Sequence, residues 1–306
     1  MLESHNITSL EGSALENAIK NDFNLEITNP EKVIKGYSSQ VYKAKLNNEI
    51  VYIRMNKDRN VFEVEKIGYK IFEEKGIPVP RIIDYKENPP TIGLPTVIMT
   101  EAKGKTMGEA KTTTEEKEAI YRHMGELLRN LHTTKLKGFG QLQVNDNELV
   151  GKFSNWKEYY EFQDKHNNNA LDYSVENKFI TPEEAEKIKN IHEEIKELNF
   201  GEAPLLHRDM HHGHVFVDGT SITGIIDLGS IMAGDPRYDI AMALVFAPES
   251  LQESLKKGYG DLAYDPMVNK YMITIAIRKI FFRTKEEIKG DIDPLLLILK
   301  NGFDKV

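Results

Sequence analysis

The spacing of apolar residues changes at about residue 105, and this change limits the folds that the chain can adopt. Before it, short segments rich in Val, Ile and Tyr are separated by polar turns, which is typical of antiparallel strands. After it, apolar residues recur every three or four positions, which is typical of helices packed on a core. At ~100–200 residues per domain, 306 residues suffice for two lobes with different tasks.

The first part predicts a small antiparallel sheet. Strands are expected at 31–35, 41–46, 50–55, 81–85 and 95–101, with one helix at 61–75 before the last two strands. Gly76 ends that helix, and prolines follow. The order β-β-β-α-β-β predicts an α+β fold with two lobes. Residues 1–103 form a small lobe with a five-stranded antiparallel sheet, and residues 104–306 form a mostly helical large lobe.

The second part carries clear helix starts. Thr113 and Thr181 each begin a capping box with Glu three residues later. Further helices are expected at 156–170, 238–246, 251–257 and 267–283, with the first decaying into a loop at the asparagines 167–169. Short strands are expected at 215–217 and 222–226. Four histidines on or beside these helices predict structural roles: His123, His132, His166 and His192.

Composition excludes several function classes. The chain has no cysteine, which excludes disulfides, thiolate catalysis and zinc–thiolate sites. Its net charge of -8 disfavours nucleic acid as a partner, because phosphate neutralisation needs a basic excess. It shows neither a signal-like N-terminus nor the ~18 consecutive apolar residues that a membrane span needs. We therefore expect a cytoplasmic protein with no membrane partner.

One polar window carries candidate chemistry. Four histidines fall between His207 and His214, between an apolar pair and a predicted strand, and the next predicted strand ends at Asp227. We expect this topology to bring Asp209 and Asp227 to the same edge of the fold. A metal-assisted phosphoryl or acyl transfer site requires such a pair, because one carboxylate holds the cation and the other orients the attacking group.

These residues carry a family resemblance. The run from His207 to His214, then Asp227-Leu228-Gly229 and then residues 234–239, resembles the aminoglycoside phosphotransferase family. Residues 51–54, Val-Tyr-Ile-Arg, stand where that fold has its V-A-I-K strand, and residues 98–104 match its hinge. The resemblance covers about residues 31–239. It implies a bilobal protein-kinase-like fold, with a nucleotide-binding N-terminal lobe, and a kinase that phosphorylates a hydroxyl group of a small molecule.

The resemblance implies a role for each matching residue. Asp209 would accept or orient the proton of the substrate hydroxyl. His214 and Asp227 would bind Mg²⁺, or Mn²⁺, which bridges the phosphates of ATP or GTP. His207 and Asp239 would brace the catalytic loop. Arg54, held by Glu65, would contact the phosphates of the nucleotide, and Ser38 and Ser39 would cover them. The main chain of Thr100 and Ala102 would bond the base, which would lie beneath Val41 and behind Met99.

Three features depart from the patterns of related kinases. Residues 36–41 lack the G-x-G-x-x-G of protein kinases, which fits antibiotic-kinase relatives that use serine there. Arg54 replaces the usual lysine, so a planar guanidinium replaces a compact ammonium. His214 replaces the usual asparagine, although Mg²⁺ prefers oxygen ligands. The aminoglycoside 2″-phosphotransferase branch resembles this chain in placing histidine there.

Charge distribution and resemblance together predict a cationic acceptor. Residues 106–306 hold 33 acidic and 25 basic residues, whereas residues 1–105 are neutral overall. A negative field over the large-lobe wall of the cleft would attract aminoglycosides, which are polycationic and rich in hydroxyls. The same surplus also serves solubility, which by itself explains the count.

Other functions stay open at this point. Small-molecule kinases of the same fold act on choline, homoserine, methylthioribose, fructosamines or macrolides, and fold analogy does not separate them. A metal-dependent hydrolase would use His207, Asp209, His211 and His212 around zinc, although we expect the last two at the loop surface. A noncatalytic kinase-like protein would bind nucleotide without turnover.

Overall fold

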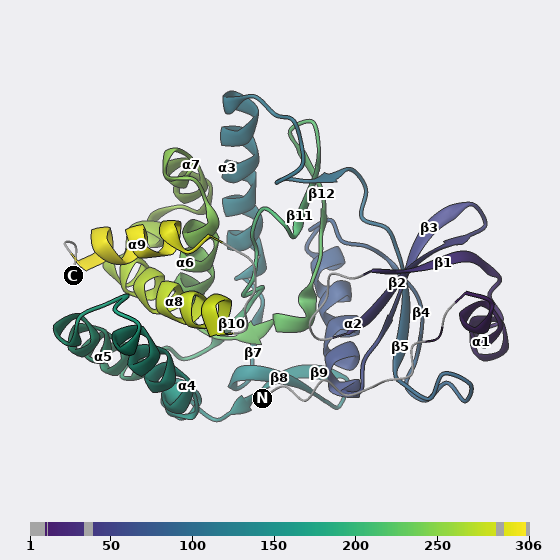
Figure 1. Cartoon of the computed structure of the whole chain (residues 1–306), viewed down its shortest axis with the longest axis horizontal. Coiled ribbons are helices and arrows are strands. Elements are labelled where there is room, and N and C mark those ends of the chain that lie inside the picture. Colours follow the sequence, from purple (N-terminus) through teal and green to yellow (C-terminus); the bar gives the residue numbers. More distant parts are fainter. Residues whose placement is uncertain (1–9, 11, 34–38, 286–290, 304–306) are drawn as a thin grey trace.

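The computed structural model describes residues 10, 12–33, 39–285 and 291–303. Figure 1 shows a small lobe built on a sheet and a larger lobe built mainly from helices. β5 (Thr96–Thr100) is the last strand of the small sheet along the chain, and β6 (Lys105–Thr106) already pairs within the large lobe. The predicted α+β, two-lobed architecture is confirmed.

The small lobe contains a five-stranded antiparallel sheet in the order β1-β2-β3-β5-β4. Its other strands are β1 (Ile27–Val33), β2 (Gln40–Leu46), β3 (Glu49–Met55) and β4 (Ile82–Lys86). Helix α2 (Arg59–Glu74) lies between β3 and β4 in the sequence, which confirms the predicted order. β1 begins earlier than expected because Ile27 already pairs with Leu46 of β2, and residues 34 and 35 lie outside the described part.

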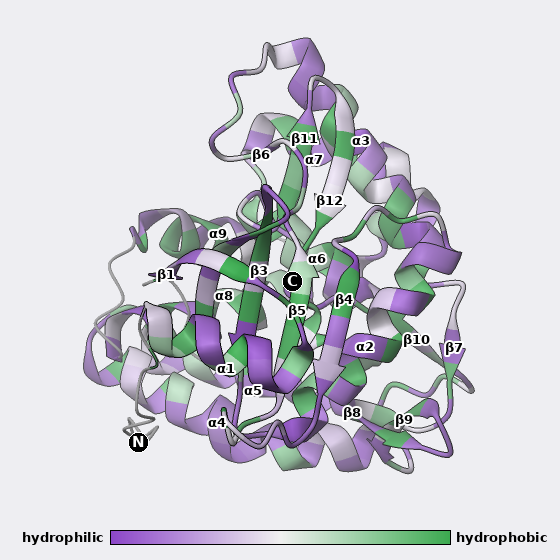
Figure 2. Cartoon of the chain, turned by 90° about the vertical axis from the view of Figure 1, so that its right-hand side faces the viewer, coloured by the Kyte–Doolittle hydropathy of each residue, from purple (hydrophilic) through white to green (hydrophobic). Residues whose placement is uncertain are grey.

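The two faces of this sheet have different partners. Val51, Ile53 and Met55 of β3 are buried in one cluster with residues of α1 (Ser13–Phe23), a helix that the sequence analysis did not predict. Figure 2 shows hydrophobic residues along β3 and β5 in the middle of the sheet. Because side chains alternate along a strand, Arg54 points to the opposite face, where it contacts α2.

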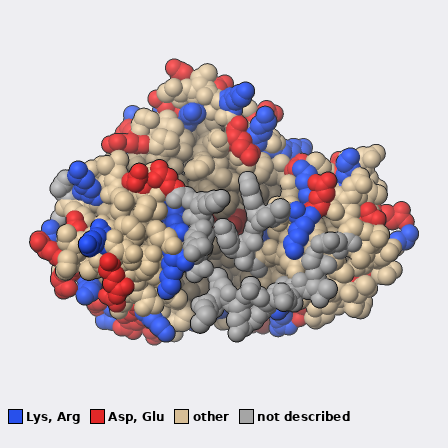
Figure 3. All heavy atoms as spheres, in the orientation of Figure 1, with Lys and Arg blue, Asp and Glu red and all other residues tan. Residues whose placement is uncertain are grey.

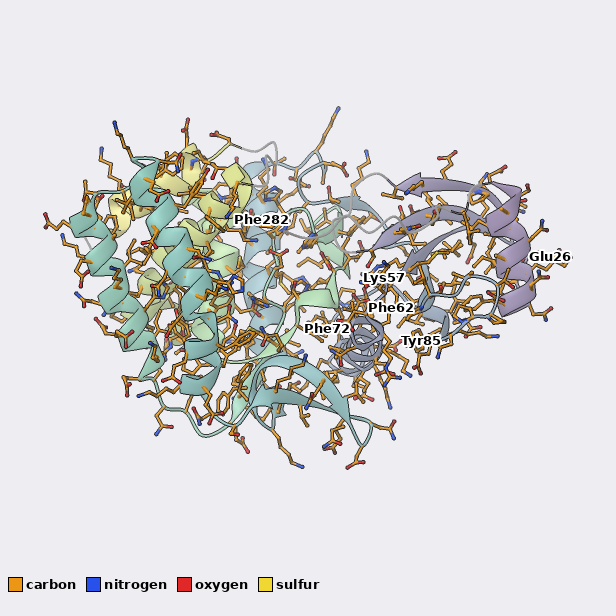
Figure 4. The ribbon with its side chains drawn as sticks, turned by 60° about the horizontal axis from the view of Figure 1, so that its bottom comes forward. Glu26, Lys57, Phe62, Phe72, Tyr85 and Phe282 are labelled. Carbon is orange, nitrogen blue, oxygen red and sulfur yellow. The ribbon has the colours of Figure 1, made fainter. Side chains whose placement is uncertain are left out.

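Helix α2 packs into both lobes. Its Tyr69 and Phe72 belong to the same buried cluster as the core of the large lobe. The ring centroid of Phe72 lies 6.0 Å from that of His207 in the large lobe, whereas Phe62 contacts Tyr85 of β4 (Figure 4). The orientation of α2 therefore depends on both lobes.

The large lobe is built mainly from helices. They are α3 (Thr114–Leu131), α4 (Trp156–Glu176), α5 (Pro182–Lys196), α6 (Pro236–Phe246), α7 (Glu249–Tyr259), α8 (Pro266–Lys285) and α9 (Asp293–Phe303). Thr113 and Thr181 form the predicted capping boxes of α3 and α5. α8 is buried along most of its length, as its apolar sequence predicts. Among the described residues, no helix combines the length and apolar character needed to cross a membrane.

Some expectations for this lobe are wrong or incomplete. Residues 167–169 are not a loop, because α4 continues through them and buries Asn167 and Ala170 against the core. Strands β7 (Lys135–Leu136), β8 (Phe139–Asn145) and β9 (Glu148–Phe153) were not predicted, and neither was α9. The turn between β8 and β9 has positive φ at Asp146 and Asn147, a tight hairpin turn that these residue types favour.

Short strands position the polar window. The loop at 207–214 leaves β10 (Ala203–Leu206) and enters β11 (Val215–Asp218), which pairs with β12 (Ser221–Ile225) and with β6. β10 pairs with β7 and with β13 (Met232–Ala233). Because Asp227 follows β12, it lies beside the start of β11. The structure thus confirms the hairpin that the sequence predicts, and brings the two aspartates to one edge.

Helices α3 and α7 approach each other closely at two glycines. A Cβ atom built on Gly258 would lie 1.9 Å from the backbone oxygen of Arg122, and one built on Gly125 would lie 2.2 Å from that of Leu255. No side chain larger than hydrogen fits at either position without moving the two helices apart.

We therefore expect Gly258→Ala to lower the free energy of unfolding by about 1 to 3 kcal/mol, the usual cost of overpacking. Gly201→Ala is the matched control, because nothing lies within 4 Å of a Cβ atom there, and it should change stability by less than about 0.5 kcal/mol. Urea denaturation of both variants measures the difference. Equal midpoints would contradict the close contact.

Candidate functional site

Asp239 of α6 holds the base of the 207–214 loop. Its buried carboxylate accepts hydrogen bonds from the backbone amides of His207 at 2.7 Å and Arg208 at 2.6 Å. Arg208 has φ 71°, a left-handed conformation that residues with side chains seldom adopt. His132 contacts the same carboxylate and the Tyr259 hydroxyl, so it is a structural histidine, as expected. The two amide bonds stabilise a turn that is strained by itself.

The ring of His207 connects this turn to the neighbouring strand. The Asp209 amide donates to Nδ1 of His207 at 3.2 Å, so Nδ1 carries no proton, and Nε2–H donates to the Ile226 carbonyl at 3.2 Å. Burial lowers the pKa of His207, which favours this neutral ring. One side chain thereby sets the spacing between Asp209 and the residue before Asp227.

Asp209 lies among three basic side chains. Its Oδ1 is 3.2 Å from Lys279 Nζ, and its Oδ2 is 3.6 Å from His214 Nδ1 and 3.9 Å from His211 Nε2. Burial by itself raises the pKa of Asp209, but the positive charge of Lys279 is the largest opposing effect, and the pKa lies below its usual range. The carboxylate is therefore ionised at neutral pH and can accept a hydrogen bond or a proton.

His214 and Asp227 face each other on the opposite side of the loop. Nδ1 of His214 donates to the Asp209 carbonyl at 2.9 Å, which leaves Nε2 without a proton in the neutral ring. This Nε2 lies 3.7 Å from Oδ2 of Asp227. A nitrogen lone pair beside a carboxylate oxygen fits a cation held between them, so the donor set can bind a divalent metal.

A second set of donors lies close by. One ligand atom each of Asp209, His211 and His214 fall within 4.8 Å of one another. The Gly213 amide donates to Nδ1 of His211 at 3.0 Å, so Nε2, which faces Asp209, carries the proton. Lys279 brings a further positive charge to the same carboxylate. This arrangement disfavours a cation there and gives no support to the hydrolase alternative.

Arg54 and Glu65 form a bidentate ion pair in the small lobe. Nη1 lies 2.5 Å from Oε2 and Nη2 lies 2.9 Å from Oε1, and Glu65 is only 2% exposed. Burial by itself lowers the pKa of Arg54, but the charge of Glu65 raises it above its ordinary value, so the guanidinium stays charged. A Cβ atom on Gly229 would lie 3.0 Å from Glu65, so the pair reaches the turn that carries Asp227.

The loop and sheet residues assigned to the nucleotide are placed as follows. Val41 pairs with Arg54 across β2 and β3, and it is half-buried. Ser39 precedes β2, and its hydroxyl accepts a hydrogen bond from Asn56 Nδ2 at 3.1 Å. Ser38 lies outside the described residues. The structure thus brings Val41 to the same strand pair as Arg54.

The hinge residues lie at the end of β5. Met99 is buried between the lobes. The Thr100 amide donates to the Arg81 carbonyl at 2.9 Å, so it is not available to a ligand. Within the described part of the chain, the backbone of Ala102 makes no hydrogen bond, which leaves its amide available. Of these two backbone amides, the structure therefore leaves only that of Ala102 free to donate.

A cavity of about 330 Å³ opens beside Asp209 in the large lobe. It lies between α4, α6, α8 and the 207–214 loop, and its basic lining residues Arg208, Arg278 and Lys279 were not predicted as functional. The available signal was a pair of adjacent cations, Arg278 and Lys279, inside the largely apolar stretch 271–282 of α8. His166 lines this cavity, although a structural role was expected. Figure 3 shows Lys and Arg atoms on the large-lobe side of the central hollow.

Comparison with known proteins agrees with this geometry. Residues 32–267 match the model of the phosphotransferase enzyme family, APH. An aminoglycoside 3'-phosphotransferase of Enterococcus faecalis is 25% identical over 237 residues, which cover 74% of this chain and 81% of that protein. A hygromycin-B 4-O-kinase of Escherichia coli is 20% identical over 267 residues, which cover 81% of this chain and 72% of that protein.

Solved structures share the fold. A thermostable mutant of aminoglycoside phosphotransferase APH(4)-Ia, in a ternary complex with ADP and hygromycin B, has a TM-score of 0.74 at 17% identity and covers 95% of this chain and 98% of its own. A macrolide 2'-phosphotransferase from Brachybacterium faecium has a TM-score of 0.59 at 13% identity, with 94% and 97% covered.

The buried ion pair predicts a large stability effect. Glu65→Gln leaves the mostly buried guanidinium of Arg54 without its ion-pair partner, so the free energy of unfolding should fall by about 3 to 5 kcal/mol. Glu87→Gln is the control, because it removes the partner of Arg59 in an exposed pair, which should cost at most about 1 kcal/mol. Urea denaturation compares them, and similar small losses in both variants would show that Arg54 does not depend on Glu65.

Proposed function

The chain belongs to the phosphotransferase enzyme family, and from this premise we propose that it transfers the γ-phosphoryl group of ATP or GTP to a hydroxyl of a small molecule. One observation carries the proposal. Asp209 lies between the His214–Asp227 pair and the cavity in the large lobe, so a carboxylate stands where a phosphate donor and an acceptor would meet.

The residues of the candidate site have separate roles in such a reaction. The ionised Asp209 accepts a hydrogen bond from the acceptor hydroxyl, orients its oxygen and takes its proton. Arg54, fixed by Glu65, binds the phosphates. His214 and Asp227 would hold a divalent metal, which neutralises phosphate charge when bound. Because phosphoryl transfer needs little covalent work from the protein, placing these groups supplies most of the rate.

Two acceptor classes have support. The names of the aminoglycoside and hygromycin relatives support an aminoglycoside, the acceptor that the sequence analysis favours. The cavity instead supports a metabolite alcohol that is not polycationic. Three basic side chains line it where a negative wall was expected, and these would repel a polycation. The surplus acidic residues of the large lobe therefore do not line this cavity.

A nucleotide-consumption screen tests the proposal. The purified chain is supplied with ATP or GTP and with Mg²⁺ or Mn²⁺, and then with panels of aminoglycosides, macrolides and metabolite alcohols. Acceptor-dependent release of the nucleoside diphosphate, together with a product heavier by one phosphoryl group, is expected for one class. Nucleotide binding without turnover on any panel would favour the noncatalytic alternative.

Substitutions of the two aspartates should impair different steps. Asp209→Asn should lower kcat by about 10²- to 10⁴-fold and leave nucleotide affinity nearly intact, because Asp209 is assigned to the acceptor. Asp227→Ala should instead abolish metal-dependent nucleotide binding. Asp218→Asn, on an exposed turn, is the control for both. Steady-state kinetics and calorimetric titration with nucleotide separate the effects, and a shared loss of nucleotide affinity would refute the division of roles.

His214 sets the expected metal preference. In His214→Asn an oxygen ligand can replace the imidazole nitrogen, so activity should survive and should shift toward Mg²⁺ relative to the softer Mn²⁺. The ratio of kcat/KM in the two metals measures the shift. An unchanged ratio in an active variant would show that His214 does not contact the metal.

A further inference from the structure

The cavity beside Asp209 carries an excess of positive charge. Arg208, Arg278 and Lys279 contribute cationic side chains, and Asp209 is the one carboxylate among its lining residues in the described part of the chain. The other lining residues are neutral or apolar, among them Tyr238 and Phe282. The lining therefore holds more positive than negative side chains, and a bound anion would offset that excess.

Two of the cations form no ion pair within the described residues, although the charge of Asp209 acts on Arg208. The guanidinium of Arg278 reaches only the amide oxygen of Gln163, at 3.4 Å. Arg208 interacts with the hydroxyl of Tyr238, which is also neutral. Guanidinium groups in a partly enclosed site are normally balanced by an anion, because removing them from water is costly. Both therefore face the cavity with unused capacity to bind one.

Lys279 forms an ion pair with Asp209, the carboxylate that the proposed reaction needs. Its ammonium lies 3.2 Å from Oδ1 of Asp209 and 5.1 Å from the centre of the Phe246 ring. When an acceptor hydroxyl binds Asp209, the hydroxyl and the Lys279 ammonium both contact this carboxylate. The ammonium can then also contact a second group of the acceptor. An acceptor with its own anion supplies that contact, whereas an acceptor with ammonium groups does not.

From the charges and contacts of this cavity we infer that the acceptor carries an anionic group, a carboxylate or a phosphate, near the hydroxyl that is phosphorylated, and that Arg278 and Lys279 bind it. The inference rests on the proposed function and names the substrate class of that site. A polycationic acceptor would bring like charges together here. The volume of about 330 Å³ is at the low end for ligand pockets and suits a molecule of monosaccharide size.

Calorimetry with four sugars of similar shape tests the charge preference. Glucuronate, glucose 6-phosphate, glucose and glucosamine are titrated into the full chain, first free and then saturated with AMP-PNP and Mg²⁺, with hygromycin B as a polycationic comparison and inorganic phosphate as the smallest anion. We expect an anionic sugar to bind at least about tenfold more tightly than glucose, and glucosamine more weakly than glucose. The two anionic sugars distinguish a carboxylate from a phosphate preference.

Two substitutions at one position provide the internal control. Arg278→Gln should weaken anion binding by about 10- to 100-fold, the usual effect of losing a charged hydrogen-bond partner, whereas Arg278→Lys should restore most of it. A misfolded variant is recognised by its melting temperature and by the loss of AMP-PNP binding. Inorganic phosphate in the AMP-PNP-saturated protein reports on the cavity alone, because the nucleotide fills the other phosphate site.

Tighter binding of hygromycin B or glucosamine than of the anionic sugars would overturn the inference. So would the absence of binding by every anion, or an Arg278→Gln variant that binds them as the unmodified chain does. The proposed function fails separately, through a lack of AMP-PNP binding or of phosphoryl transfer. Because the nucleotide-free titrations do not depend on either, they test the charge preference in every case.

Discussion

The arrangement of the site depends on one buried carboxylate. Asp239 binds the two backbone amides at the start of the 207–214 loop and stabilises the left-handed turn at Arg208. From this turn the ring of His207 reaches both the amide of Asp209 and the strand that ends before Asp227. Phe72 of α2 packs on the same ring. Asp209, the edge that carries Asp227 and the small-lobe helix α2 are thus positioned through one buried carboxylate, so we expect its loss to displace all three.

Sequence reasoning succeeded where local pattern and ordered motifs decide the structure. The strand order of the small lobe and the capping boxes at Thr113 and Thr181 follow from local rules and were confirmed. The pairing of Arg54 with Glu65 was expected from the resemblance, and the structure brings the two together, although the roles of the site residues stay predictions. α1 was missed although Leu15, Ile19 and Phe23 have helical spacing, and α4 was cut short because asparagines suggest a turn unless burial overrides them.

The acceptor cavity could not be derived from composition, because net charge is a property of the whole surface. The acidic surplus of residues 106–306 predicted a negative wall, yet three basic side chains and one carboxylate line the cavity, among neutral and apolar residues. Arg278 and Lys279 lie on α8, far in the sequence from Asp209, and only the packing of α8 against the loop brings them together. A tertiary contact of this kind has no local signature beyond two adjacent charges in a largely apolar stretch of the helix.

The shared position of α2 has a consequence for how the molecule loses its structure. The cluster between α1 and the sheet is small, while Tyr69 and Phe72 of α2 lie in the core of the large lobe. The small cluster between α1 and the sheet is not large enough to stabilise the small lobe by itself. The small lobe therefore depends on α2, which the large lobe also needs. Unfolding of either lobe removes a surface against which α2 packs in the other lobe. We therefore expect the two lobes to unfold as one cooperative unit, even though the cleft divides them in shape.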